Sequence, residues 1–280
     1  MSTLNTTTLA NRPTTLNNTT DVGKSYFETD SNKILVWDGS AFNEWNADLS
    51  SFNNYSLDFD GTDDYMKTTG FTLGSAYSFS VWFNLDVSPS SRMLLSSEHY
   101  FTSGYDNFIF RVKTSTSIDL FSYSGASSPQ SITMTVPTLS TGTWYNVVLT
   151  NPGDGSSAQG YLNGSSVTTS GHTTRSFTDL QGSKGLIVGD DLTNRNAAFN
   201  GKIDEVAVFN YSLSSSEVAS IYGSSGTPAN LNNQLSTGPL GWWRMGDNNS
   251  GTGTTITDQG SGGNDGTIVN GPTFSTSVPL

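Results

Sequence analysis

The chain has 280 residues, no cysteine and a formal net charge of −12. Its length allows one large all-β domain or two smaller domains, and the absence of cysteine excludes disulfides and thiolate metal sites. Because the acidic balance repels phosphate backbones and anionic membrane surfaces at long range, we expect neither nucleic acid nor a membrane as a partner. Glycine, serine, threonine and asparagine are abundant, which favours strands joined by turns over long helices.

The first twenty residues are rich in threonine and asparagine and contain almost no large apolar side chains. Such a segment cannot bury a core of its own, so residues 1–20 are predicted to form an extended arm that becomes ordered on assembly. The start MSTLNTTTLANRP lacks the basic and apolar stretches of a signal peptide, and no apolar run approaches the roughly 18 residues of a membrane span. We therefore expect no export by the usual secretory route.

Residues 21–50 are predicted to form a small β module. Two short apolar runs, Tyr26-Phe27 and 34–37, are separated by the turn-forming sequence ETDSNK, and a second turn follows at the sequence DG. Short runs punctuated in this way indicate a β-hairpin or a three-stranded unit.

The sequence from Arg12 to Trp45 resembles a short module of bacteriophage tail-fibre and other virion proteins. The shared pattern is an Arg-Pro lead followed by Gly, Tyr-Phe-x-Thr-Asp, Asn-Lys and Trp-Asp-Gly. The resemblance implies attachment to other virion proteins, and the assembly residues expected from it are Arg12, Pro13, Tyr26, Phe27 and Trp37. The alternative is a generic β-meander with a small aromatic core, formed by Tyr26, Phe27, Trp37 and Trp45. The two interpretations can both hold.

Between residues 51 and 226 the sequence reads as successive strands. Segments such as AYSFSVWFNLD, NFIFRVK, TWYNVVLT, AQGYLNG, GLIVGD and KIDEVAVFNY are rich in β-branched and aromatic residues, and turn signals separate them at short intervals. This pattern favours a β-sandwich over a βαβ architecture. Alternation in the first segment places one set of side chains on one face: Tyr77, Phe79, Val81 and Phe83. Only SLSSSEVASIYG indicates a helix, with Ser214 as its cap, Glu217 at the capping-box position and Gly223 at its end.

Several of these strings resemble, in order, the marks of the laminin-G-like, concanavalin A-type jelly roll that is common in bacterial and phage proteins. They are LDFDGTDDYM, FSVWFNL, WYNVVLT, YLNG and FNGKIDEVAVFNYSLSSSEVASIYG. The last is the most specific, because the family typically combines Gly-x-Ile-Asp-Glu-Val with an aromatic residue and a Leu-Ser helix turn. The resemblance implies an all-β fold, a concanavalin A-like (laminin-G-like) jelly-roll sandwich over residues 51–226, with the small N-terminal β-hairpin module before it.

The C-terminal segment, residues 241–280, resembles the lead-in that precedes the Asp-rich turn in this family, here placed at the end of the chain. In one account this segment completes the jelly roll of its own chain as a permuted lead-in strand, and residues 227–240 form a crossover linker. In the other account it begins a second repeat that a neighbouring chain completes. The first account is favoured, because a partial repeat would leave an unpaired sheet edge.

Four aspartates lie within seven residues of the string SLDFDGTDDYM. Carboxylates packed this closely repel one another unless they face solvent, cap a turn or surround a cation. Loops of this kind often bind calcium in the family that the chain resembles, so Ca²⁺ is the expected cofactor. The candidate ligands are Asp60 and Asp63, followed by Asp204, Asp190 and Asp191. The alternative is an Asx-type turn whose carboxylates cap backbone amides.

Because glucanases share this jelly roll, a pair of catalytic carboxylates is the feature to look for. Laminarinase-like members carry Glu-x-Asp-x-x-Glu, and this string is absent from the chain. Strand alternation predicts that Asp204 and Glu205 lie on opposite faces, so that they cannot flank one glycosidic bond. The two histidines, His99 and His172, fall in predicted loops. We therefore expect no catalytic residues and no enzyme activity.

Sugar sites combine aromatic faces with nearby amide, carboxylate and backbone groups. The predicted loops offer such groups at Tyr100, Tyr105, Asp106, Asn107, Asn194 and Arg195. The alternative is that these residues are ordinary solvated loop tips. The tryptophans of the strand-like segments are expected in the core instead, namely Trp82, Trp144, Trp242 and Trp243.

The two resemblances together predict a non-enzymatic structural protein of a phage, assembled in the host cytoplasm and then part of the virion. It is expected to form homo-oligomers and, as a tail fibre, appendage or surface protein, to adsorb to host surface polysaccharide through its jelly-roll loops. Two alternatives are open. A capsid decoration or head-fibre protein would stabilise the particle without binding sugar, and an enzyme would degrade polysaccharide.

Overall fold

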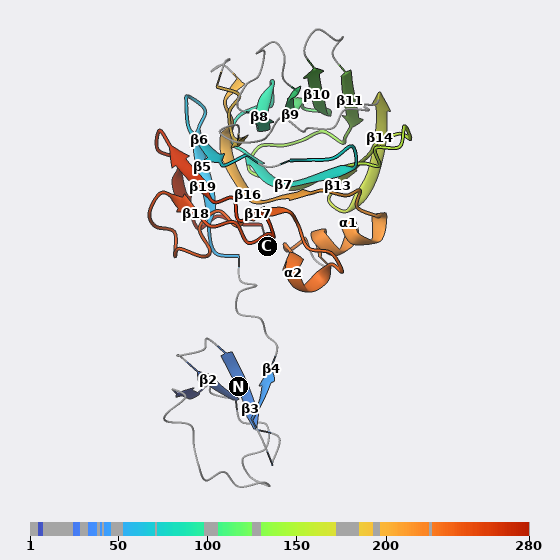
Figure 1. Ribbon diagram of the computed structural model, residues 1–280. Helices are drawn as coiled ribbons and strands as arrows, with labels where there is room; N and C mark the ends of the chain where they lie inside the picture. The colour runs from blue at the N-terminus through green and yellow to red at the C-terminus, as the bar shows by residue number, and fades with distance from the viewer. Residues whose placement is uncertain are drawn as a thin grey trace. The chain divides into compact units, whose positions relative to one another are not determined.

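The chain divides into two units, Met1–Phe52 and Asn53–Leu280 (Figure 1). The computed structural model describes the second unit over residues 53–70, 72–97, 106–124, 130–171, 185–192, 197–223 and 226–279. In the first unit it describes four strands and Ser40.

The first unit contains a four-stranded sheet. Its strands, in order, are β1 (Asn5–Thr7), β2 (Ser25–Glu28), β3 (Lys33–Trp37) and β4 (Phe42–Trp45). The last three form an antiparallel meander where the sequence predicts a hairpin or three strands, and β1 pairs with β2 in parallel. Part of the segment predicted as an extended arm therefore belongs to this sheet.

The predicted assembly residues are only partly covered by these strands. Arg12 and Pro13 lie outside the described residues. Tyr26 and Phe27 lie in β2 and Trp37 ends β3, and the structure describes the backbone of both strands. Their role in assembly stays a prediction.

The second unit is a sandwich of two antiparallel sheets (Figure 1). Sheet I consists, in order, of β20 (Thr273–Ser275), β5 (Ser56–Asp60), β16 (Asn200–Phe209), β7 (Tyr77–Leu85), β12 (Trp144–Asn151), β13 (Gln159–Leu162) and β14 (Ser165–Gly171), with β17 (Gly241–Trp243) paired to β16. Sheet II continues from β14 through β11 (Gln130–Thr135), β10 (Ser117–Ser124), β9 (Asp106–Thr114), β8 (Arg92–Ser97), β15 (Leu186–Val188), β6 (Tyr65–Thr68), β19 (Gly266–Val269) and β18 (Thr255–Ile256). Because β14 pairs with both β13 and β11, it joins the two sheets along one side. The all-β sandwich predicted from the sequence is confirmed.

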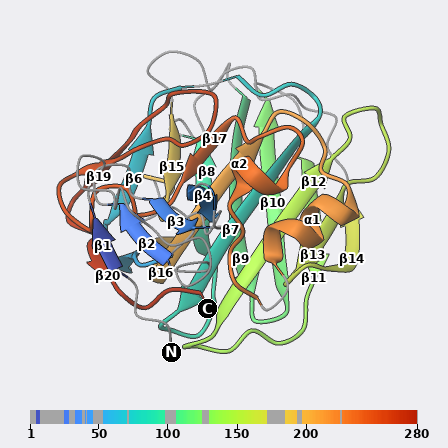
Figure 2. The ribbon, with the colours of Figure 1, turned by 90° about the horizontal axis from the view of Figure 1, so that it is seen from below.

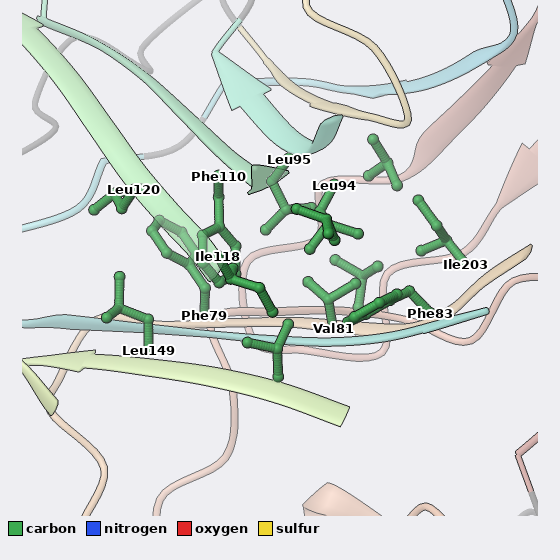
Figure 3. Packing of buried hydrophobic residues seen from close by; sticks show 14 of the residues in the cluster. Phe79, Val81, Phe83, Leu94, Leu95, Phe110, Ile118, Leu120, Leu149 and Ile203 are labelled. Atoms are coloured by element: carbon green, nitrogen blue, oxygen red, sulfur yellow. The ribbon is translucent and has the colours of Figure 1, made fainter. Parts of the chain in front are cut away.

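Side chains that alternate along the strands of both sheets fill one core between them (Figure 3). β7 contributes Phe79, Val81 and Phe83, as its alternating sequence predicts, and all three are fully buried. They meet side chains of β9, where the rings of Phe79 and Phe108 are stacked with their centroids 5.1 Å apart. Burying a side chain of this kind stabilises the fold by about 1.5–3 kcal/mol relative to leaving it exposed.

Two short helices, α1 (Ser215–Tyr222) and α2 (Leu231–Gln234), cover the outer face of sheet I (Figure 2). α1 begins as predicted, because the side chain of Ser214 accepts a hydrogen bond from the Glu217 amide and Glu217 completes the capping box. Apolar side chains of both helices pack on that face of the sheet, namely Val218, Ile221 and Leu231 in one cluster with Phe209 and Trp242. Neither described helix is long and apolar enough to cross a membrane.

The C-terminal segment contributes strands to both sheets of its own chain. β17 pairs with β16 and β20 with β5 in sheet I, whereas β19 pairs with β6 in sheet II. Trp243 and Met245 from this segment are fully buried in the core. α2 lies within residues 227–240, the predicted crossover linker.

Candidate functional site

The acidic turn, Asp60–Asp64, connects β5 to β6 and brings three carboxylates together. Oxygen atoms of Asp60, Asp63 and Asp64 all lie within 4.8 Å of one another. Asp60 is exposed, Asp63 is half-buried and Asp64 is buried. Two of the predicted cation ligands therefore lie side by side, and Asp64, which was not among the predicted ligands, joins them.

Two of these carboxylates also cap backbone amides of the turn. The Thr62 amide donates to Asp60 Oδ1 at 2.7 Å, and the Asp60 amide donates to Asp64 Oδ2 at 3.0 Å. The Asx-type turn considered as the alternative is therefore present. These bonds use one oxygen of each carboxylate, which leaves the other oxygen as a ligand for a cation.

Side chains from two distant segments fix the acidic turn. The Asn200 Nδ2 donates to the carbonyl of Asp60 at 2.7 Å, and the Asn270 Nδ2 donates to the carbonyl of Asp63 at 2.9 Å. Gly61 has φ +80°, and a Cβ there would lie 2.5 Å from the Asn200 amide nitrogen. The approach of Asn200 therefore requires glycine at position 61.

The electrostatics of the acidic turn favour a bound cation. Burial raises the pKa of Asp64, and the negative charges of Asp60, Asp63 and Asp58 raise it further, against a backbone hydrogen bond that lowers it. A hard divalent cation would relieve this repulsion, and carboxylate oxygens are the donors that Ca²⁺ prefers. Because Ca²⁺ takes about 6–8 oxygen ligands, three carboxylates supply part of a shell that backbone carbonyls and water would complete.

The other predicted ligands lie elsewhere. Asp190 and Asp191 follow β15 and are buried, and Asp190 Oδ1 accepts a hydrogen bond from the Asp191 amide at 2.8 Å. Asp204 is buried in β16, where its carboxylate accepts a hydrogen bond from Asn53. Among the described residues, the group of carboxylates at ligand distance contains none of the three. The structure therefore does not bring them into the acidic turn.

Asp204 and Glu205 lie on the same face of sheet I, so the prediction of opposite faces is wrong. The register of β16 against β7 shifts between Asp204 and Ala207, and Glu205 has φ +47°. Ile203 and Val206 on either side both point into the core. A β-bulge at this point therefore turns the two acidic side chains together onto the outer face.

A buried ion-pair cluster holds Glu205 in place. Arg244 Nε lies 2.9 Å from Glu205 Oε1 and Arg244 Nη2 lies 2.8 Å from Asp247 Oδ2. Trp242 Nε1 donates to Glu205 Oε2 at 2.6 Å. Burial raises the pKa of Glu205, and the charge and hydrogen bond of Arg244 oppose the rise.

Neither carboxylate of this bulge is placed for catalysis on a sugar. Asp204 is 0% exposed and Glu205 is 4% exposed. A retaining or inverting pair must face a glycosidic bond from both sides, which enclosed side chains cannot do. Their contacts with Asn53, Trp242 and Arg244 assign them to the structure of the sandwich.

The sugar contacts expected from the sequence fall in two predicted loops and at the start of β9. Tyr100, Tyr105, Asn194 and Arg195 lie outside the described residues, as do His99 and His172. Asp106 and Asn107 begin β9, of which the backbone is described at that point, and Asn107 pairs with Tyr123 of β10. Ile109 and Arg111 follow at alternate positions of β9 and share its outer face.

This outer face of sheet II carries a polar cluster that sequence reasoning missed. Arg111 Nε lies 2.8 Å from Asp119 Oδ1, and Lys113 Nζ lies 3.3 Å from Asp119 Oδ2. The side chains of Arg111 and Lys113 are 22% and 46% exposed. Register places Phe121 next to this cluster on β10 and Thr133 beside Asp119 on β11. The alternation of NFIFRVK was the signal, because Arg111 and Lys113 occupy the positions between core residues.

One family model matches the chain, over residues 60–219, and its description is the concanavalin A-like lectin/glucanases superfamily. The matched residues make up more than half of the chain. The chain belongs to this superfamily. The jelly-roll class predicted from the sequence is therefore confirmed. No curated protein matches the chain.

Solved structures similar to this chain come from several sources. A Bacteroides ovatus protein described as a presumed carbohydrate binding protein has a TM-score of 0.58 at 18% identity, over 92% of this chain and 71% of that chain. An SAP-like pentraxin from Limulus polyphemus has a TM-score of 0.49 at 15% identity, over 64% and 87%. The enzymatically active domain of tailspike protein 2 from bacteriophage CBA120 has a TM-score of 0.45 at 13% identity, over 66% and 28%.

Proposed function

We propose that the second unit is a non-enzymatic carbohydrate-binding domain that binds glycans on the outer face of sheet II. The arrangement of Arg111 carries this proposal. Its guanidinium donates twice to Asp119 and once to Ser91, which fixes the group and leaves two of its N–H groups for a ligand. A planar donor held in this way binds a sugar hydroxyl without the entropic cost of ordering a free arginine.

Neighbouring side chains supply the other elements of a sugar site. Phe121 is half-buried on the same face, and an aromatic side chain contributes contact area for the apolar face of a sugar ring. Thr133 and Ser131 on β11 lie beside Asp119 and Phe121 in register and add hydroxyl groups. Membership of the lectin/glucanase superfamily supports binding, and the enclosed position of Glu205 supports a domain without catalysis at the β16 bulge.

Glycan binding should depend on the Arg111 side chain and not on basic side chains outside the outer face of sheet II. Multivalent display of the protein on a glycan array should reveal polysaccharide binding. Arg111→Gln should weaken it by about 10- to 100-fold, since a hydrogen bond to a charged group contributes about 1.5–3 kcal/mol. Lys202→Gln is the matched control, because Lys202 pairs with Asp58 and Asp86 on sheet I. An array without signal at high valency, or equal losses in both variants, would overturn the proposal.

We propose in addition that the acidic turn binds Ca²⁺. At a free Ca²⁺ concentration of about 100 times Kd the cation should stabilise the fold by about 2.7 kcal/mol and raise Tm by about 5–10 °C, and a chelator should reverse the change. Asp63→Asn should abolish the shift. Asp154→Asn should retain it, because Asp154 caps Ser156 in a similar turn that belongs to no carboxylate group of the described residues. An unchanged Tm with either reagent would leave the acidic turn as a structural turn.

The first unit is proposed to attach the chain to a phage particle as part of a homo-oligomer. The resemblance of residues 12–45 to virion modules supports this role, and Arg12, Pro13, Tyr26, Phe27 and Trp37 are the proposed contacts with other virion proteins. Immunogold labelling of purified particles with antibody against residues 56–280 tests it. Gold on the tail or fibres supports adsorption, gold over the head supports capsid decoration, and unlabelled particles contradict a virion role.

A further inference from the structure

Two carboxylates hold the segment through which the chain enters the second unit. Asn53 Nδ2 donates to Asp204 Oδ2 at 2.8 Å. The amides of Asn54 and Tyr55 both donate to Asp247 Oδ1, at 2.8 and 3.0 Å. We name residues Asn53–Tyr55 the entry segment. It is fixed to the bulge of β16 and to the turn after β17, both on the outer side of sheet I.

The charges around this contact are unbalanced. One guanidinium, that of Arg244, lies within the electrostatic reach of Asp204, Glu205 and Asp247. It forms salt bridges with Glu205 and Asp247. Asp204 is fully buried, and among the described residues it accepts hydrogen bonds from the Asn53 side chain and from the Glu205 amide, at 2.8 Å each. Among the described residues, no cation forms a salt bridge with Asp204.

This environment favours the protonated form of Asp204 over the ionised form. Burial raises the pKa of Asp204 well above its usual range, and the charges of Glu205 and Asp247 raise it further, against hydrogen bonds from Asn53 and the Glu205 amide that lower it. Burial also raises the pKa of Asp247, although the charge of Arg244 opposes the rise. Within the described part of the chain, Asp204 differs from the other two because no salt bridge compensates its ionised form.

The partner of Asp204 can serve both of its protonation states. Asp204 Oδ2 accepts from Asn53 Nδ2 in the structure, which either protonation state of the carboxyl allows. A protonated carboxyl needs an acceptor, and the Asn53 Oδ1 is buried without a hydrogen-bond partner among the described residues. Rotation of the amide by half a turn exchanges its oxygen and nitrogen and places that acceptor against Asp204.

We propose that Asp204 and Asn53 form a proton-operated latch, in which protonated Asp204 holds the entry segment on the sandwich and loss of the proton releases it. In the released state water reaches the carboxylates, so their burial and mutual repulsion are relieved. Because the closed state binds the proton more tightly than the open state, acid favours closure and rising pH favours opening. The latch would set how firmly the entry segment is held on the sandwich.

Cleavage by chymotrypsin after Tyr55 in the full chain tests this latch. Asp204→Asn cannot ionise, and comparing it with the unmodified protein at each pH cancels the pH dependence of the protease. The cleavage rate of the unmodified protein relative to the variant should rise by up to about tenfold per pH unit above the ordinary aspartate pKa near 4, and level off above the raised pKa. A ratio that stays constant between pH 5 and 9 would overturn the proposal.

A second variant covers the case in which Asp204→Asn does not fold. Asn53→Ala removes the acceptor and keeps the backbone amides bound to Asp247, so it should be cleaved several-fold faster than the unmodified protein at pH 5 and at the same rate at pH 9. Equal rates at pH 5 would contradict the latch. Asp154→Asn, which removes one carboxylate from a turn outside both proposed binding sites, should keep the unmodified pH profile. Loss of the profile in that variant would assign the effect to overall charge and overturn the proposal.

Discussion

Replacing Arg244 with methionine should lower the free energy of unfolding by about 3–5 kcal/mol. The guanidinium is 5% exposed and pairs with Glu205 and Asp247, which are equally enclosed. Methionine fills much of the volume, so the loss would come from two buried carboxylates left without a cation. Urea denaturation followed by tryptophan fluorescence measures the change, since Trp242 donates to Glu205.

Lys202→Met is the matched control for that variant. Lys202 also pairs with two carboxylates, but those of Asp58 and Asp86 are 33% and 43% exposed. Water solvates these groups when the lysine is lost, so the expected change is about 0–1 kcal/mol. If Arg244→Met lowers the free energy of unfolding by no more than Lys202→Met does, burial of the Arg244 cluster does not make its ion pairs more important for stability.

Ending the chain at Leu240 should prevent the second unit from folding. The missing residues supply β17, β19 and β20, and with them Trp243, which is fully buried and donates to the Asn264 carbonyl at 2.9 Å. The milder change Trp243→Ala should cost about 3–5 kcal/mol. Near-ultraviolet circular dichroism and urea denaturation distinguish a folded sandwich from a collapsed chain.

A chain that begins at Asn53 provides the comparison. It lacks more residues than the C-terminal truncation, yet it keeps every strand of both sheets. We expect it to unfold cooperatively. If the chain ending at Leu240 unfolds with the same cooperativity and midpoint as the full chain, the C-terminal strands are dispensable for folding.

The sequence predicts the local parts of this fold well. Alternation in β7 identifies Phe79, Val81 and Phe83 as core residues, and Ser214 with Glu217 marks the start of α1. These signals are carried by residues that are close together in the chain. The fold class follows from them, since each strand exposes one apolar face that only a second sheet can cover.

The bulge in β16 could not be predicted in the same way. Strand alternation assigns Asp204 and Glu205 to opposite faces, and neither residue type signals the positive φ that Glu205 adopts. The partner that fixes Glu205 is Arg244, 39 residues further along the chain. A tertiary contact therefore overrides the alternation of side chains along the strand. Nothing in the string KIDEV indicates this contact.

The candidate sites also differ in whether their residues are close together in the chain or are brought together by the fold. The acidic turn was found because Asp60 and Asp63 lie within one short loop, whereas Asp190, Asp191 and Asp204 are separated from it by the fold. The pair Arg111 and Asp119 was missed, because it depends on the register between β9 and β10. Pairings across strands become visible only when the register is known.

The position of β5 has a mechanical consequence. β5 follows the entry segment directly and is bonded on one side to β16 and on the other to β20. A pulling force applied through the chain at Asn53 therefore acts on a strand held by two ladders, and it cannot peel away an edge. Resistance to such a force is governed by the rate of unfolding rather than by equilibrium stability. A force between a ligand bound on sheet II and the chain at Asn53 would therefore act across both sheets of the sandwich.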